Sequence, residues 1–208
     1  MINPCVPDII VSRLPIYLRT LELLSAEGIR TTSSQLLAEK LGISAAQIRK
    51  DLSQFGEFGK QGTGYSVNHL IEQLRSILHL THPWELILIG AGDLGSALAR
   101  YQGFSNRGFK VAAAYDSDKE KVGKKIGKIE IRSTDQLEAD IKKHGYKIAM
   151  LSIPASEAQH VTDQLVAAGI KAILSYAPVN LRTPEDVRVS YLDPLSQLQH
   201  LTYYLDSK

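Results

Sequence analysis

The sequence has one cysteine, Cys5, among its 208 residues, so no disulfide can form within the chain. This composition suits a reducing compartment, and we expect the protein to be cytoplasmic. No apolar run approaches the roughly 20 residues that a membrane-spanning helix needs. The N-terminus also lacks the pattern of a secretory signal peptide. We therefore expect no membrane partner.

The sequence also has no large excess of either charge. It contains 24 lysines and arginines and 22 acidic residues, which gives a net charge of +2. This balance excludes a polybasic nucleic-acid coat but not a compact DNA-reading surface. The sequence also has no Gly-x-Ser-x-Gly elbow, no His-Glu-x-x-His pattern and no P-loop lysine. We therefore predict no catalytic residue and no metal site, so we do not expect an enzyme.

The most informative motif that is present is the glycine-rich segment 90–95, which directly follows an apolar run. Gly90 permits a tight turn, Gly92 lets the backbone approach a pyrophosphate, and Gly95 lets a helix pack close to the strand. Asp116 ends the next apolar run, 21 residues after Gly95, where the ribose-binding carboxylate of an NAD site is expected. The alternative is a strand–helix turn that binds nothing. The predicted NAD(H)-binding residues here are Gly90, Ala91, Gly92, Asp93, Leu94, Gly95, Asp116 and Ser117.

Residues 84–192 are predicted to form a Rossmann-like, doubly wound parallel sheet of the α/β class. Strands and helices alternate along this segment, and residues 119–128 are interpreted as a solvated loop. Ligands of such sheets bind outside the carboxyl ends of the strands. Two short apolar segments follow predicted strands and are equally well interpreted as turns or as the lining of a nicotinamide pocket: Ile153, Pro154, Ala177 and Pro178.

Residues 1–80 are predicted to form a winged helix-turn-helix domain. A helical period over residues 12–27 predicts a first helix with Ser12 as its N-cap. Capping-box patterns at 32–35 and 44–47 predict two further short helices, joined by a tight glycine-containing turn. This pair of helices is the expected helix-turn-helix.

The second of these helices, over residues 45–54, is predicted to bury Ile48, Leu52 and Phe55. Its opposite face carries polar side chains that can reach phosphates and base edges, although a solvated surface is the alternative. Residues 56–67 contain four glycines among aromatics and one lysine, which is typical of a β-hairpin wing. The predicted DNA-binding residues are Ser44, Gln47, Arg49, Lys50, Ser53, Lys60, Gly62 and Tyr65.

The end of the chain, residues 193–208, is predicted to be a dimerisation helix. Leucines at 195, 198, 201 and 205 lie on one helical face. This stripe either packs on its own domain or joins two chains. A dimer is attractive because helix-turn-helix proteins usually read two half-sites.

Together, the segment 47–56 (QIRKDLSQFG), the glycine wing and the segment 90–99 (GAGDLGSALA) resemble the redox-sensing transcriptional repressor Rex family. The resemblance covers nearly the whole chain. It implies a bacterial cytoplasmic homodimer that senses the NADH/NAD⁺ ratio and is released from palindromic operator DNA by NADH. It also implies that the last helix is swapped between subunits.

Carried over residue by residue, the resemblance makes Arg49 and Lys50 the recognition-helix contacts and Lys60 the wing contact. It assigns Arg19, Tyr101 and Asp193 to a network that links the N-terminal helix, the nicotinamide pocket and the swapped region. Tyr101 is also expected to line the cofactor pocket. Pro194 stands where some members carry an aromatic residue, which leaves the nicotinamide packing open. The rival functions are an NAD-dependent oxidoreductase and a nucleotide-binding accessory protein.

Overall fold

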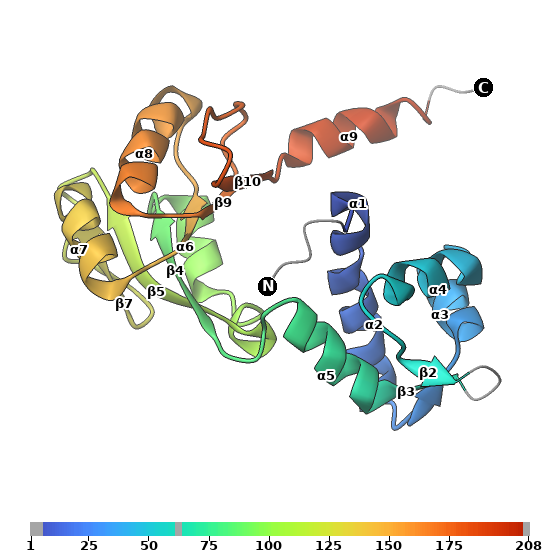
Figure 1. Ribbon diagram of the computed structural model, residues 1–208. Helices are drawn as coiled ribbons and strands as arrows, with labels where there is room; N and C mark the ends of the chain where they lie inside the picture. The colour runs from blue at the N-terminus through green and yellow to red at the C-terminus, as the bar shows by residue number, and fades with distance from the viewer. Residues whose placement is uncertain (1–5, 61–63, 206–208) are drawn as a thin grey trace. The chain divides into compact units, whose positions relative to one another are not determined.

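The chain, in a computed structural model, is described over residues 6–60 and 64–205. It divides into two compact units, Met1–His82 and Pro83–Lys208. Figure 1 shows the helices and strands of both units. No helix in the described residues is long and apolar enough to cross a membrane.

The first unit is a bundle of short helices with a small antiparallel sheet. Its strands have the order β1-β3-β2, so the predicted hairpin is present and gains an additional strand, β1. The helices are α1 (Asp8–Val11), α2 (Leu14–Ala26), α3 (Ser34–Leu41), α4 (Ala45–Ser53) and α5 (Val67–Ile77). The strands are β1 (Thr31–Thr32), β2 (Gly59–Lys60) and β3 (Gly64–Ser66).

Serine side chains begin three of these helices. The hydroxyls of Ser33, Ser44 and Ser66 accept hydrogen bonds from backbone N–H groups in the first turns of α3, α4 and α5. Such caps satisfy donors that have no partner inside the helix. The prediction that Ser12 caps the first long helix is wrong, because Ser12 ends the separate helix α1 and Arg13 precedes α2.

The core of the first unit is formed by one face each of α2, α3, α4 and α5. Ile48 and Leu52 of α4 are buried as predicted, whereas Phe55 is only half-buried at the edge of this core. The fully buried residues that fill its centre are Leu14, Leu21, Leu24, Leu37, Ile48, Val67, Leu70 and Leu74.

The second unit is built on a seven-stranded sheet with the order β10-β9-β8-β4-β5-β7-β6. All neighbouring strands are parallel except β6 and β7, which pair antiparallel. Of these two, β6 lies inside segment 119–128, so the interpretation of that whole segment as a loop is wrong at β6. The strands are β4 (Trp84–Ile89), β5 (Phe109–Asp116), β6 (Lys125–Ile126), β7 (Ile129–Ser133), β8 (Ile148–Leu151), β9 (Ala172–Ser175) and β10 (Arg188–Tyr191). The chain winds in one direction from β4 to β7 and in the other from β8 to β10, which is the doubly wound Rossmann order.

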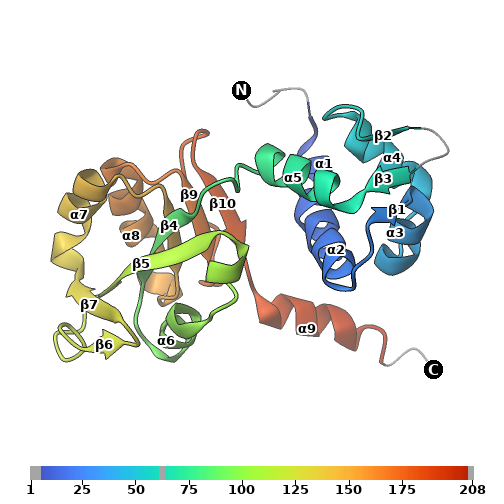
Figure 2. The ribbon, with the colours of Figure 1, turned by 90° about the horizontal axis from the view of Figure 1, so that it is seen from below.

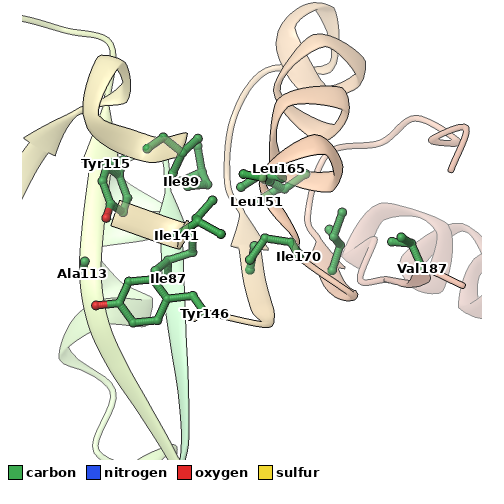
Figure 3. Packing of buried hydrophobic residues seen from close by; sticks show 14 residues of the cluster. Ile87, Ile89, Ala113, Tyr115, Ile141, Tyr146, Leu151, Leu165, Ile170 and Val187 are labelled. Carbon is green, nitrogen blue, oxygen red and sulfur yellow. The ribbon is translucent and has the colours of Figure 1, made fainter. Parts of the chain in front are cut away.

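Helices cover both faces of this sheet (Figures 1 and 2). They are α6 (Asp93–Arg100), α7 (Leu137–His144) and α8 (Ala155–Ala168), followed by α9 (Pro194–Thr202), with 3₁₀ turns η1 (Ser105–Arg107) and η2 (Thr134–Gln136). Because side chains alternate along a strand, Ile87 and Ile89 pack with α7 and α8, whereas Leu86 and Leu88 pack on the α6 side. Figure 3 shows the first of these layers, including Ile141 of α7.

The last helix, α9, has no buried residue in the described structure. It extends away from the sheet in both views (Figures 1 and 2). Leu195, Leu198, Leu201 and Leu205 are 65%, 57%, 58% and 77% exposed. The predicted leucine stripe therefore does not pack on the domain that carries it.

Candidate dinucleotide site and DNA-reading surface

The glycine-rich loop lies where the strand order of the sheet reverses, at the ends of the neighbouring strands β4 and β8. Gly90 has a φ of 93°, and a Cβ there would come within 2.4 Å of the carbonyl oxygen of Ser152. A Cβ at Gly95 would lie 1.9 Å from the carbonyl oxygen of Gly90. Both positions therefore require glycine, as the motif predicts.

Ser152 links the end of β8 to the end of β4, a role that the sequence did not reveal. Its hydroxyl lies within hydrogen-bond distance of two carbonyl oxygens, 2.9 Å from that of Gly90 and 3.2 Å from that of Ile89. The first residue after β8 is thereby fastened to the end of β4. This contact fixes the loop from which α6 begins.

The N-terminus of α6 differs from those of the serine-capped helices. Within the described residues, no side chain caps it at Gly92, so its first N–H groups are left for another acceptor. A Cβ built on Gly92 meets no described atom within 4 Å, which means that this side of the loop is open. An uncapped helix start with open space before it fits the diphosphate of a dinucleotide.

Asp116 lies at the end of β5, beside this loop, and is 7% exposed. One carboxylate oxygen accepts the backbone N–H of Ala91 at 2.7 Å, and the other accepts that of Asp118 at 2.9 Å. Burial opposes ionisation of Asp116, but these N–H groups and the ammonium of Lys121 outweigh it, so its pKa lies below the usual value. The predicted ribose acceptor therefore also anchors the glycine-rich loop.

The other predicted cofactor residues follow the carboxyl ends of neighbouring parallel strands. Ser117 comes directly after β5, and Ile153 and Pro154 follow β8. The side chain of Ile153 would lie 2.8 Å from a Cβ at Gly90, so it borders the loop. Ala177 and Pro178 follow β9, and Ala177 is buried. Their contact with a nicotinamide ring stays a prediction.

Tyr101 is not brought to the loop. It ends α6, and eight helical residues separate it from Gly92, which is about 12 Å along a helix. Tyr101 is 55% exposed, and its ring makes a T-shaped contact with that of Phe104, with the ring centroids 5.3 Å apart. Within one chain, the structure does not support Tyr101 as a neighbour of the phosphate-binding loop.

The remaining residues of the predicted switch lie in different parts of the chain. Arg19 is exposed on α2 of the first unit. Asp193 begins α9 in the second unit, where its carboxylate accepts the N–H of Leu195 and the hydroxyl of Ser196. Their link to Tyr101 stays a prediction.

The predicted DNA-reading surface is centred on α4. Arg49 and Lys50 are both exposed, and the guanidinium of Arg49 donates to the hydroxyl of Ser34 at 2.9 Å. A groove of about 870 Å³ lies between the helices α3 and α4 on one side and the hairpin β2–β3 on the other. Arg49, Ser53 and Tyr65 all line it. The structure thus brings these three predicted residues to one concave surface.

The hydroxyls of two predicted DNA-binding residues, Ser44 and Ser53, form hydrogen bonds with the backbone. Ser44 caps α4, and the hydroxyl of Ser53 donates to the carbonyl oxygen of Lys50 at 2.8 Å. The side chain of Lys60 and the whole of Gly62 lie outside the described residues.

Asp51 is the polar residue of α4 that sequence reasoning missed. It is fully buried, and Arg13 donates to its two oxygens at 2.6 and 2.8 Å. The Tyr17 hydroxyl and the Gln47 amide each donate at 2.6 Å. Gln47, predicted to face DNA, is therefore half-buried and held by Asp51. These contacts tie the recognition helix to the beginning of α2.

Comparison with known proteins agrees with this arrangement. A family model described as "CoA binding domain" matches residues 81–179, and one described as "Putative DNA-binding protein N-terminus" matches residues 5–53. The redox-sensing transcriptional repressor Rex of Chloroflexus aurantiacus is 50% identical over 199 residues, covering 96% of this chain and 94% of the relative. The chain belongs to the Rex family of redox-sensing transcriptional repressors.

Solved structures of RSP, a Rex-family repressor, have the same fold. The RSP complex with β-NAD⁺ and operator DNA gives a TM-score of 0.93 at 38% identity, covering 98% of this chain and 94% of that one. The complex with β-NADH gives 0.89 at 36% identity, covering 98% and 96%. The predicted fold class, a winged helix-turn-helix followed by a Rossmann-like sheet, is confirmed, and so is the Rex resemblance.

Proposed function

We propose that this Rex-family chain binds operator DNA through α4 and the hairpin, and that NADH at the glycine-rich loop releases it. The observation that carries the proposal is the uncapped start of α6, with open space at Gly92, in a chain that also carries an exposed, basic recognition helix. RSP has been crystallised with β-NAD⁺ and operator DNA and, separately, with β-NADH. On this proposal the protein is a cytoplasmic sensor and not an enzyme.

Different residues around the glycine-rich loop bind different parts of the dinucleotide. The first N–H groups of α6 bind the diphosphate, while Asp116 accepts a hydroxyl of the adenosine ribose. The segments after β8 and β9 border the nicotinamide. The bound cofactor supplies the signal, because NAD⁺ carries a positive charge on the nicotinamide ring that NADH lacks.

A ligand shifts a two-state equilibrium only by binding the two states with different affinity. We propose that Arg19, Tyr101 and Asp193 couple the difference in cofactor affinity between the two states to the DNA-binding unit. Binding is reciprocal, so operator DNA should weaken NADH binding by the factor by which NADH weakens operator binding. NADH affinity measured calorimetrically with and without saturating palindromic operator tests this proposal. Equal affinities would show that the dinucleotide does not control DNA binding.

Replacing Lys50 with alanine should weaken specific operator binding by about 1–3 kcal/mol if the ammonium contacts a base. Lys50 is exposed on α4, so the fold should be unaffected. Mobility shifts with the operator and with a scrambled duplex give the specific and non-specific affinities. Lys40→Ala is a matched control, since Lys40 is an exposed lysine at the end of α3. Unchanged specificity in Lys50→Ala would remove this residue from the reading surface.

We also propose that α9 joins two chains into a homodimer with swapped helices, because its leucines are exposed and adjacent. Replacing Leu198 with glutamate should weaken the dimer by about 100-fold, since the carboxylate would lose water in the interface. Light scattering during size-exclusion chromatography measures the oligomeric state. Gln199→Glu adds the same charge beside the stripe and should leave the dimer intact. A dimer that survives Leu198→Glu unchanged would exclude this role for α9.

A further inference from the structure

The segment between β9 and β10, residues 176–187, is fastened at two consecutive residues. The side-chain amide of Gln159, on α8, accepts the backbone N–H of Arg182 at 2.8 Å and donates to the carbonyl oxygen of the same residue at 3.0 Å (Figure 1). The hydroxyl of Tyr191, at the end of β10, accepts the N–H of Leu181 at 2.8 Å. Side chains from two neighbouring elements therefore hold the middle of this segment.

The amide of Gln159 is fixed in its orientation. Its nitrogen also donates to a carboxylate oxygen of Asp163 at 2.8 Å, so the amide oxygen and the amide nitrogen are both engaged. A carboxylate in the same place would have no hydrogen for the carbonyl oxygen of Arg182 and would repel Asp163. The contact therefore requires glutamine, whereas a solvated position on a helix would accept glutamate equally well.

These contacts join the two segments that are predicted to border the nicotinamide. Residues 153–154 lead directly into α8, and Pro154 precedes Gln159 by five residues. Residues 177–178 follow β9 and lie four residues before Arg182. The hydrogen bonds between Gln159 and Arg182 thus link the two walls of the predicted pocket over a short length of chain. They limit how far these walls can separate.

We propose that Gln159 and Tyr191 are positioning residues that hold the segment after β9 against α8 and thereby fix the width of the nicotinamide pocket. The proposal rests on the proposed binding of NAD(H) at the glycine-rich loop. When a site is correctly formed in only a fraction of the molecules, its apparent affinity falls by that fraction. Loss of either contact should therefore weaken binding of the nicotinamide. The ADP-ribose part of the cofactor should be unaffected, because the glycine-rich loop and Asp116 hold it.

Calorimetric titration of the full-length protein with NADH and with ADP-ribose, which lacks the nicotinamide ring, tests this inference. Gln159→Ala should weaken NADH binding about tenfold, and the isosteric Gln159→Glu should weaken it as much. Tyr191→Phe removes only the hydroxyl and should weaken NADH binding about threefold. The affinity of all three variants for ADP-ribose should change by less than about twofold. Gln164→Ala, at an exposed position of α8, is the control and should leave both affinities unchanged.

Two results would overturn the proposal. One is an unchanged NADH affinity in Gln159→Ala, or in Tyr191→Phe if the first variant does not fold. The other is an equal loss of NADH and ADP-ribose, because these residues would then only stabilise the unit as a whole. Failure of the wild-type protein to bind NADH would instead overturn the proposed function, so the two failures are distinguishable.

Discussion

Replacing Asp51 with alanine is expected to lower the free energy of unfolding by about 3–5 kcal/mol, because it leaves a charged partner without its counter-ion. Asp51 is fully buried and accepts hydrogen bonds from Arg13, Tyr17 and Gln47. Without it, the hydrogen bonds that join the start of α2 to α4 are lost, so operator affinity should fall together with stability. Denaturant unfolding and mobility shifts on the full-length protein measure the two effects.

The exposed acid Glu39 of α3 provides the control, and Glu39→Ala should change stability by less than about 0.5 kcal/mol. A double variant, Arg13→Met with Asp51→Leu, should recover part of the loss, because neither charge is then left alone. Operator binding should not recover with it, since Gln47 would still lack its partner. A loss below 1 kcal/mol in Asp51→Ala would contradict this description of the network.

The same carboxylate should also shape the dependence of stability on pH. Burial opposes its ionisation, but hydrogen bonds from Arg13 and Tyr17 outweigh burial, so the pKa of Asp51 lies below its ordinary value. Asp51 therefore stabilises the fold fully above pH 4 or so, and this contribution is lost as the pH falls through the folded-state pKa. Asp51→Asn should accordingly flatten the acid side of the stability profile.

Replacing Gly92 with alanine should weaken NADH binding about 10- to 100-fold while leaving the fold intact. The added methyl group meets no described atom within 4 Å, and the backbone at Gly92, with a φ of −72°, accepts any residue. The methyl group would instead occupy the space proposed for the diphosphate. Calorimetry measures the binding, and thermal unfolding without cofactor measures the fold.

Gly95→Ala is the informative counterpart, because its methyl group would lie 1.9 Å from the carbonyl oxygen of Gly90. This variant should lose both NADH binding and stability, the latter by about 1–3 kcal/mol. Wild-type NADH affinity in Gly92→Ala would contradict the placement of the diphosphate at the start of α6.

Most of the architecture could be predicted because local signals and the fold agree. Glycine after an apolar run marked the turn at Gly90, and hydroxyl residues before helical segments marked the starts of α3 and α4. The short strands β1 and β6 were not predicted, because two residues cannot show a periodic pattern. Both are defined by pairing with a neighbouring strand.

The polar contacts of the sites were harder to predict, because they join residues that are distant in sequence. Asp51 lies on the buried face of α4 by its spacing from Ile48, and a charge there is a signal that was available. Its partner Arg13 is 38 residues away, which no periodicity reveals. Lys121 was hidden for a different reason, because a lysine in a lysine-rich segment resembles a solvated one until its distance to Asp116 is known.

If α9 joins two chains as proposed, its exposure makes the number of protein molecules in a cell a second input to regulation. A helix of nine residues without buried contacts is barely stable in water on its own. In the proposed dimer, a second chain supplies the missing contacts, so the order of α9 depends on how often two chains meet. When a cell holds too few chains to form dimers, the operators would stay unbound at any NADH/NAD⁺ ratio. The rate at which the repressor is synthesised would then set the point at which the cell begins to respond to that ratio.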